Sequence, residues 1–250
     1  MSSLKALVYD VCAQVAMEFS GWRFVSGKFK SSLLGHTELI VDLGLHFDRG
    51  FSSLQPRVEV RNKRCELLAK SLLDIKDRHA IPVSAIGFRN FREQLQFTPE
   101  SKRGTCIICL DKESFVAEIR KKDSGDSEMR LRKENAAIGV EELYPIIGAM
   151  IKDSILFLES HYDFSSEENL LRGLPVRYEA REKVPYAELE KSAGLVFCIV
   201  RLMLGDFAFV ESYASDSYKT IYPKRTVELK KIIEKLPALK ARYAEIGSVF

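Results

Sequence analysis

The residues best suited to chemistry lie in two segments that alternate apolar and polar side chains, as strands with one buried face do. In residues 37–48, "TELIVDLGLHFD", one face of the predicted strand is polar and carries Glu38, Asp42, His46 and Asp48. The other face is predicted to be core and carries Leu39, Val41, Leu43, Leu45 and Phe47. Glu59 stands in the next alternating segment, "RVEVR", at residues 57–61.

This arrangement has the outline of a metal-dependent nuclease site. Some such enzymes hold Mg²⁺ and a scissile phosphate with a carboxylate on one strand and Glu-x-Lys or Glu-x-Arg on the next. The ion takes oxygen ligands, and a nearby cation stabilises the developing phosphate charge. Asp42 and Glu59 are the candidate metal ligands, and Arg61 is the candidate catalytic cation. His46 is a further candidate, as a ligand or a general base.

A simpler interpretation of the same residues is the one we favour. The motif lacks the usual Lys at its last position, and alternating strands produce such patterns by chance. We therefore expect Asp42 and Glu59 to pair across the strands with cations on a solvated sheet face, the candidates being Arg57, Arg61, Lys28 and Lys30. On this interpretation the protein uses no metal and no cofactor, and His46 is a surface histidine.

The cysteines are predicted to be reduced and buried. "CIIC" at residues 106–109 has the spacing of a redox or zinc half-site. A redox pair normally lies at a helix N-terminus, however, and a zinc site needs a second pair, whereas Cys12, Cys65 and Cys198 are scattered singly. Because 106–109 reads as an apolar strand, we expect its two thiols to behave as small core residues.

The order of predicted elements indicates an α+β fold. Apolar spacing predicts an N-terminal helix, then strands and one helix, and these segments are residues 3–19, 22–33, 37–48, 57–61, 62–78, 81–88 and 105–110. Residues 112–122 fit either a strand or a short helix. The fold is thus an antiparallel sheet of about five strands packed against helices, with a helical C-terminal half.

The predicted organisation is an α+β sheet region at residues 1–122, an exposed connection at 123–137 and a helical region at 138–250, or one continuous domain. The connection has almost no apolar face. In the helical region, "SSEENLLRGL" carries a capping box between Ser165 and Glu168 and ends at Gly173. The last helix is predicted to bury a stripe made of Val227, Ile232, Ile233 and Leu236.

Composition and charge exclude few partners. No apolar run reaches the ~18 residues that a membrane-spanning helix needs, and the N-terminus lacks the features of a signal peptide, so we expect a cytoplasmic protein.

Residues 1–122 carry 20 Lys and Arg against 14 Asp and Glu, which permits an anionic partner. Few aromatic residues lie near the basic cluster at 57–64, so a nucleic-acid partner is not favoured. The sequence does not indicate the oligomeric state.

A short pattern resembles an uncharacterised bacterial family of unknown function. It consists of "GWRFVSGKF" at residues 21–29, "LIVDLGLHF" at 39–47 and, more loosely, "AGLVFCIVRLMLGDFAFV" at 193–210. Some members of that family sit beside toxin genes, so the resemblance implies an immunity role. It implies no catalytic residues.

Three functions follow as hypotheses. The leading one is a non-catalytic cytoplasmic binding protein with a protein partner, such as a bacterial immunity or stress-related protein. The alternative is a metal-dependent nuclease or phosphodiesterase that uses the polar sheet face. The third is a helical scaffold for protein–protein interaction.

Overall fold

The computed structural model describes residues 3–48, 50–73, 83–122, 127–179, 194–215 and 226–250. Its strands are β1 (Arg23–Val25), β2 (Lys28–Leu34), β3 (Thr37–Asp42), β4 (His46–Phe47), β5 (Phe51–Leu54), β6 (Arg57–Asn62), β7 (Ser84–Gly87), β8 (Cys106–Cys109) and β9 (Ala137–Gly139). Its α-helices are α1 (Leu4–Ala16), α2 (Lys63–Leu73), α3 (Lys112–Lys122), α4 (Ser127–Ala136), α5 (Leu143–His161), α6 (Glu167–Glu179), α7 (Gly194–Met203), α8 (Phe207–Tyr213) and α10 (Thr226–Ile246). Short 3-10 turns are η1 (Phe88–Gln94), η2 (Glu100–Lys102) and η3 (Val140–Glu142).

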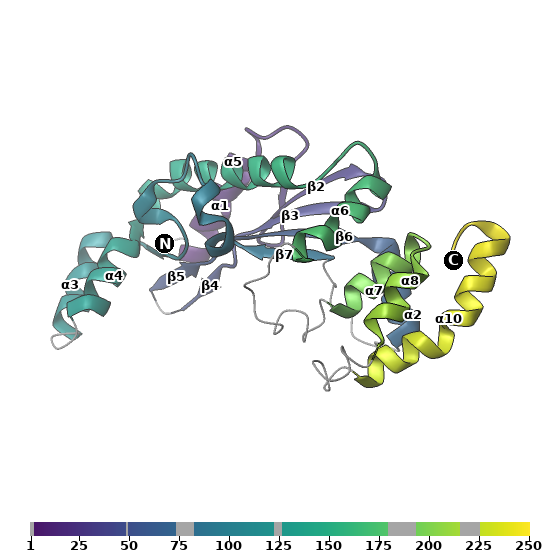
Figure 1. Cartoon of the computed structure of the whole chain (residues 1–250). Coiled ribbons are helices and arrows are strands. Elements are labelled where there is room, and N and C mark those ends of the chain that lie inside the picture. The colour runs from purple at the N-terminus through teal and green to yellow at the C-terminus, as the bar shows by residue number, and fades with distance from the viewer. Residues whose placement is uncertain (1–2, 49, 74–82, 123–126, 180–193, 216–225) are drawn as a thin grey trace. The chain divides into compact units, whose positions relative to one another are not determined.

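The predicted fold class is confirmed. The chain is α+β, with a five-stranded antiparallel sheet in the order β1-β2-β3-β6-β7 and helices in its C-terminal half (Figure 1). A second sheet, which the sequence did not predict as a separate layer, has the order β4-β5-β8-β9. Strand β8 lies between β5 and β9 in this sheet and pairs in parallel with β9.

The residues group into two compact units that interleave along the chain. The first unit comprises Met1–Leu33, Leu39–Glu59 and Ala85–His161, and the second comprises Leu34–Glu38, Val60–Ser84 and Tyr162–Phe250. Strands β2, β3, β6 and β7 have residues in both units. The domain boundaries expected at 122 and 138 stay a prediction.

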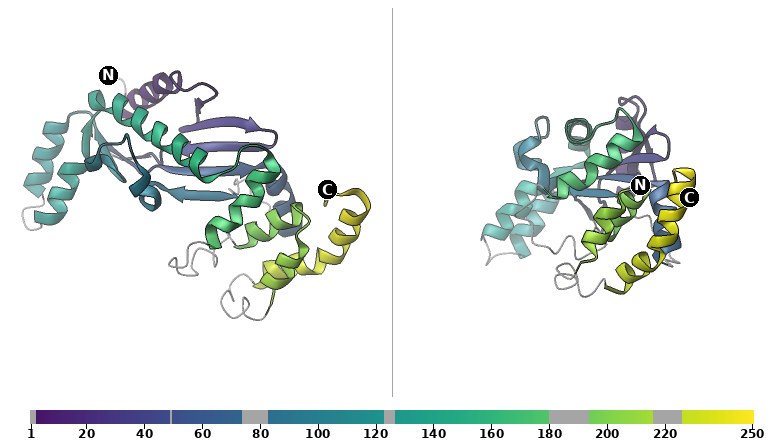
Figure 2. Two further views of the ribbon diagram at one scale, coloured as in Figure 1. Left: turned by 45° about the horizontal axis from the view of Figure 1, so that its top comes forward. Right: turned by 45° about the vertical axis from the view of Figure 1, so that its right-hand side comes forward.

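In the first unit, helices α1 and α5 lie side by side (Figure 2). The spacing of Val8, Cys12 and Val15 places all three on the buried side of α1. Tyr9 packs edge-on against Phe24 of β1, with ring centroids 5.3 Å apart, and Phe24 packs against Phe29 of β2. Helix α1 therefore covers the face of β2 that carries Phe29. Because side chains alternate along a strand, the neighbouring Lys28 points to the opposite face.

The prediction of one continuous strand over residues 37–48 is wrong. Strand β3 ends at Asp42, and β4 belongs to the other sheet, where it pairs with β5. Gly44, between them, has a left-handed backbone with φ +58°, and its N–H donates to the Asp42 carboxylate at 2.9 Å. The turn therefore carries the chain out of the five-stranded sheet before His46.

The exposed connection predicted at residues 123–137 is also only partly right. Residues 123–126 lie outside the described residues, but Ser127–Ala136 form helix α4, which packs on α3. Arg120 of α3 pairs with Glu134 of α4 at 2.8 Å. An ion pair thus joins the two helices, although the Arg120 side chain is largely exposed, so the absence of an apolar stripe did not mean the absence of a helix.

The second unit gathers helices α2, α7, α8 and α10 (Figure 1). Helix α7 is buried along most of its length, and Asp206 begins α8 by accepting a hydrogen bond from the Phe209 N–H at 3.1 Å. The buried stripe of α10 consists of Leu229, Ile232 and Leu236. Val227, predicted to belong to it, is 68% exposed.

Gly44 provides a test of the strand break. A Cβ at this residue would lie 2.4 Å from the carbonyl oxygen of Gln55, whereas a Cβ at Gly50, which also has positive φ, would meet nothing within 4 Å. Gly50→Ala should cost only the left-handed strain, about 1–2 kcal/mol. Gly44→Ala should cost roughly 3 kcal/mol or more, since backbone must also move. Urea unfolding of both variants measures this difference, and equal costs would contradict the close approach.

Candidate functional site

The polar face of the five-stranded sheet holds a closed group of four charges in the first unit. Lys28 Nζ lies 2.7 Å from Asp42 Oδ2 and 3.8 Å from Glu59 Oε2. Arg57 Nη2 lies 3.0 Å from Asp42 Oδ2, and its Nε lies 2.7 Å from Glu59 Oε1. Each cation therefore contacts both carboxylates. We call these four residues the charge square.

In the charge square the carboxylates are the buried members. The side chains of Asp42 and Glu59 are 11% and 6% exposed, against 31% for Lys28 and 50% for Arg57. Burial by itself raises the pKa of Asp42. Hydrogen bonds from Lys28 and the Gly44 N–H, with the charges of Lys28 and Arg57, outweigh that effect and hold the pKa below its usual range.

The square leaves little room for metal chemistry. Asp42 Oδ1 accepts the Gly44 N–H, its Oδ2 faces both cations, and each Glu59 oxygen faces one. A divalent cation would have to displace these bonds before it could bind oxygen ligands. Within the described part of the chain, no cluster of three or more His, Cys, Asp or Glu side chains could hold a metal ion. The predicted cross-strand pairing with cations is thus supported for Lys28 and Arg57, but the prediction of a solvated face is wrong for Asp42 and Glu59, which are both buried.

Two other predicted site residues, Arg61 and His46, do not belong to the charge square. Arg61 pairs in the second unit with Glu66 at 3.0 Å and with Glu38 at 3.5 Å. His46 lies on β4 in the four-stranded sheet, so the prediction that it shares a strand face with Asp42 is wrong. The reason is the turn at Gly44, which ends the alternation on which that prediction depended.

A buried carboxylate that the sequence interpretation missed is Asp153 of α5. Its Oδ1 accepts the backbone N–H groups of Gln96 and Phe97 at 2.9 and 2.8 Å, and its Oδ2 accepts the N–H of Thr98 at 2.7 Å and the Thr98 hydroxyl. Its only signal in the sequence is an acidic residue inside an apolar helix. Because all its bonds go to one turn, its role is to hold that turn against α5.

Glu167, at the start of α6 in the second unit, is a half-buried carboxylate that also accepts several hydrogen bonds. Its Oε1 accepts from the His36 N–H at 3.0 Å, from Thr37 Oγ1 at 2.7 Å and from Asn62 Nδ2 at 2.8 Å. Asn62 also caps α2, since its Oδ1 accepts the Cys65 N–H at 3.0 Å. Glu167 therefore ties the tip of the β2–β3 hairpin to the beginning of two helices.

The cysteines are buried thiols, as predicted. All five are free and buried, and burial raises the pKa of both Cys106 and Cys109 to about 11. Cys106 Sγ donates to the Lys102 carbonyl at 3.3 Å, and Cys109 Sγ donates to the Ile138 carbonyl at 3.2 Å. Such thiols are poor nucleophiles and poor metal ligands at neutral pH.

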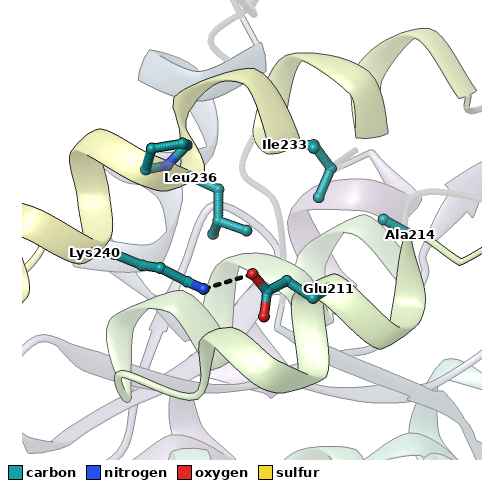
Figure 3. Close-up of a pocket in the computed structure, with 6 residues that line it drawn as sticks. Glu211, Ala214, Ile233, Leu236 and Lys240 are labelled. Carbon is teal, nitrogen blue, oxygen red and sulfur yellow. Dashed lines mark hydrogen bonds and ion pairs between the residues drawn. The ribbon is translucent and has the colours of Figure 1, made fainter.

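An apolar groove lies between α8 and α10 in the second unit. Its volume is about 460 Å³, and its lining residues are Glu211, Ala214, Ile233, Leu236, Pro237 and Lys240. Figure 3 shows Ile233, Leu236 and Lys240 on the side of α10 that faces Glu211 and Ala214. Glu211 and Lys240 form an ion pair in the groove. The remaining lining side chains are hydrophobic, as in sites that bind apolar groups.

No protein family, no curated protein and no solved structure matches this chain. Among the described helices, none is both long and apolar enough to cross a membrane.

Removal of the Asp42 charge tests the charge square. Asp42→Asn should destabilise the protein by roughly 1–3 kcal/mol at pH 7, because two cations lose a buried partner. The folded-state pKa of Asp42 is lowered, so this stabilisation is present above the unfolded pKa and is lost as the pH falls through the folded pKa. Urea unfolding at pH 7, 5 and 3 should show a difference that shrinks only at the lowest pH. The exposed Asp10→Asn serves as control, and a difference that grows on acidification would contradict the square.

Thiol labelling tests the environment of the cysteines. Iodoacetamide at pH 8 should leave Cys106 and Cys109 unmodified in the folded protein, because both are buried and largely protonated. Unfolding in urea should expose all five thiols to labelling, as read by mass spectrometry. Fast labelling of either residue in the folded state, or stoichiometric zinc in the purified protein, would overturn this assignment.

Proposed function

We propose that the protein is a non-catalytic binding protein whose partner is another protein. The observation that supports this choice over the nuclease is the charge square. Asp42 and Glu59, the two carboxylates a metal-dependent nuclease would need, are engaged by Lys28 and Arg57. These ion pairs fix the register of β2, β3 and β6 relative to one another. They also occupy the carboxylate oxygens that a metal ion would need as ligands.

The groove between α8 and α10 is the surface we assign to the partner. Apolar side chains line this hollow in the described part of the chain. Helices α8 and α10 belong to the C-terminal helical region, which the third hypothesis takes as a scaffold for protein–protein interaction. Apolar side chains in a hollow supply binding energy when a partner removes them from water. The leading and third hypotheses thus combine in one proposal, binding through helices of the second unit.

The kind of partner is a further part of the proposal. The resemblance over residues 21–29 and 39–47 to a family that includes neighbours of toxin genes favours an immunity or stress-related role. No described contact bears on that role, and it stays a prediction, as does the cytoplasmic location.

A metal-dependent activity assay separates binding from catalysis. With Mg²⁺ or Mn²⁺, the purified protein should hydrolyse neither DNA, RNA nor bis-p-nitrophenyl phosphate above the level of the double variant Asp42→Asn/Glu59→Gln. Neither ion should raise the melting temperature, because binding would have to break the four ion pairs of the square.

The double variant is the matched control, since it keeps the side-chain shapes and removes both charges. Metal-dependent hydrolysis that disappears in this variant would overturn the proposed function and establish the nuclease. A metal-dependent rise in melting temperature that Asp42→Asn abolishes would show that the charge square binds the ion, which would contradict the proposal and favour the nuclease.

A further inference from the structure

A small pocket in the second unit, here called the polar pocket, shares no described lining residue with the α8–α10 groove. Its volume is about 200 Å³, and helices α2, α6, α7 and α10 each contribute to its lining. This is smaller than the ~300–1,000 Å³ of sites for drug-sized ligands, so the pocket suits a small metabolite. We propose that it binds a free α-amino acid with an aliphatic side chain. The proposal goes beyond the proposed function and does not rest on it.

Arg64 of α2 supplies the positive charge of the polar pocket. Its guanidinium stacks on the ring of Phe250, with the guanidinium carbon 4.9 Å from the ring centroid. Among the described residues, no carboxylate pairs with Arg64 and no acceptor takes one of its N–H groups. A stacked guanidinium has a preferred orientation, and its parallel N–H groups match the two oxygens of a carboxylate. Arg64 is therefore the residue assigned to the carboxylate of the ligand.

The place of Arg64 in its helix agrees with this assignment. Arg64 directly follows Lys63, the residue at which α2 begins. Positive charge in the first turn opposes the helix dipole, whereas a negative charge there is stabilised. A carboxylate bound to Arg64 would thus lie where α2 favours negative charge.

Glu167 of α6 supplies a negative charge to the same pocket. Its Oε1 accepts the three hydrogen bonds that hold the β2–β3 hairpin tip, whereas no hydrogen bond or ion pair within the described part of the chain uses its Oε2. Glu167 and Arg64 also form no ion pair with each other there. Two opposite charges therefore line one pocket without neutralising each other, and Oε2 is the acceptor assigned to the ammonium group of the ligand.

The charges of the polar pocket disfavour ligands of a single sign. A phosphate would meet Arg64 but would be repelled by Glu167, and a simple amine would meet Glu167 but would be repelled by Arg64. Glu168, a further lining residue, pairs with Arg172 at 2.6 Å. The described lining thus offers one positive and one negative charge, which are complementary to a small zwitterion.

The rest of the pocket wall is suited to an aliphatic side chain. Its apolar lining residues are Leu171, Met203 and Leu204. The Cys65 thiol donates to the Met203 sulfur at 3.1 Å, and the Tyr243 ring packs edge-on against Phe207 with centroids 5.5 Å apart. Contacts of this kind hold the wall in place, and an apolar side chain that leaves water against it contributes binding free energy. Together with the two charges, this wall specifies an amino acid such as leucine, isoleucine or valine.

Isothermal titration calorimetry of the full chain, with L-leucine as the probe, tests the class of ligand. L-leucine should bind with a dissociation constant in the micromolar to millimolar range. N-acetyl-leucine lacks the ammonium group and leucinamide lacks the carboxylate, so each should bind at least tenfold more weakly. L-aspartate keeps both groups but has no apolar side chain, and it should also bind at least tenfold more weakly.

Arg64→Met tests the assigned carboxylate contact. Methionine is a good helix former and keeps an unbranched apolar stem, so the variant should fold. Its affinity for L-leucine should fall at least tenfold, whereas its weak affinity for leucinamide should not change. Lys63→Met removes the neighbouring exposed cation, which does not line the pocket, and should bind L-leucine as the native chain does. Urea midpoints of both variants verify that they are folded.

Glu167→Gln tests the assigned ammonium contact. Glutamine keeps an oxygen for the three donors that Glu167 Oε1 accepts, so the hairpin tip should stay in place. Affinity for L-leucine should fall at least fivefold in this variant. Affinity for N-acetyl-leucine should not fall, because that ligand brings no ammonium group to Glu167.

Several results would overturn the inference. Failure of leucine, isoleucine and valine to bind at millimolar concentration would remove it. Leucinamide that binds as tightly as leucine would assign the pocket to an amine, and N-acetyl-leucine that binds as tightly would assign it to a carboxylate. Unchanged affinity for L-leucine in a folded Arg64→Met variant would place the ligand elsewhere. None of these results affects the nuclease assay, so the proposed function and the amino-acid site fail separately.

Discussion

The Asp42 carboxylate is the interaction on which the rest of the first unit depends. One of its oxygens accepts the Gly44 N–H and so fixes the turn that ends β3. The other oxygen faces Lys28 of β2 and Arg57 of β6, the strands on either side of β3. A single side chain therefore sets both the place where the chain leaves the five-stranded sheet and the alignment of three strands within it.

The two buried carboxylates of the charge square are tolerated because each of them contacts cations. A carboxylate removed from water costs several kcal/mol unless it is paired, and Asp42 and Glu59 each face two cations whose own exposure is greater. A shift of one strand by one residue would turn these side chains to the other face and leave buried charges without partners. The same geometry that resembles a metal site in outline thus acts as a constraint on strand register.

The second unit is held together mainly by the burial of apolar helices. Helix α7 is buried almost throughout and is covered by neighbours that include α2 and α8. Glu167 and Asn62 connect the beginnings of α6 and α2 to the β2–β3 hairpin tip, so these helices start from fixed points. Helix α10 packs on α2, α7 and α8, so the hollow that it forms with α8 lies on helices that have several neighbours.

The sequence by itself determined the α+β fold class, helices α1 and α2, and the pairing of Asp42 and Glu59 with cations, but not which polar residues share their sheet face. Apolar residues at helical spacing predict α1, namely Leu4, Leu7, Val8, Val11, Val15 and Phe19. The alternation around Asp42 and Glu59 predicts their pairing with cations, because both patterns are local. Only the tertiary structure decided the break at Gly44, because the pairing of β4 with β5 brings Gln55, which follows β5, close to the left-handed Gly44. The groove has the same origin: the sequence predicts Ile233 only as part of the buried stripe of the last helix, and Ile233 lines a groove with Ala214 only because α8 and α10 pack together. Local periodicity encodes which side chains face a core, but contacts between distant segments decide which of the remaining surfaces becomes a site.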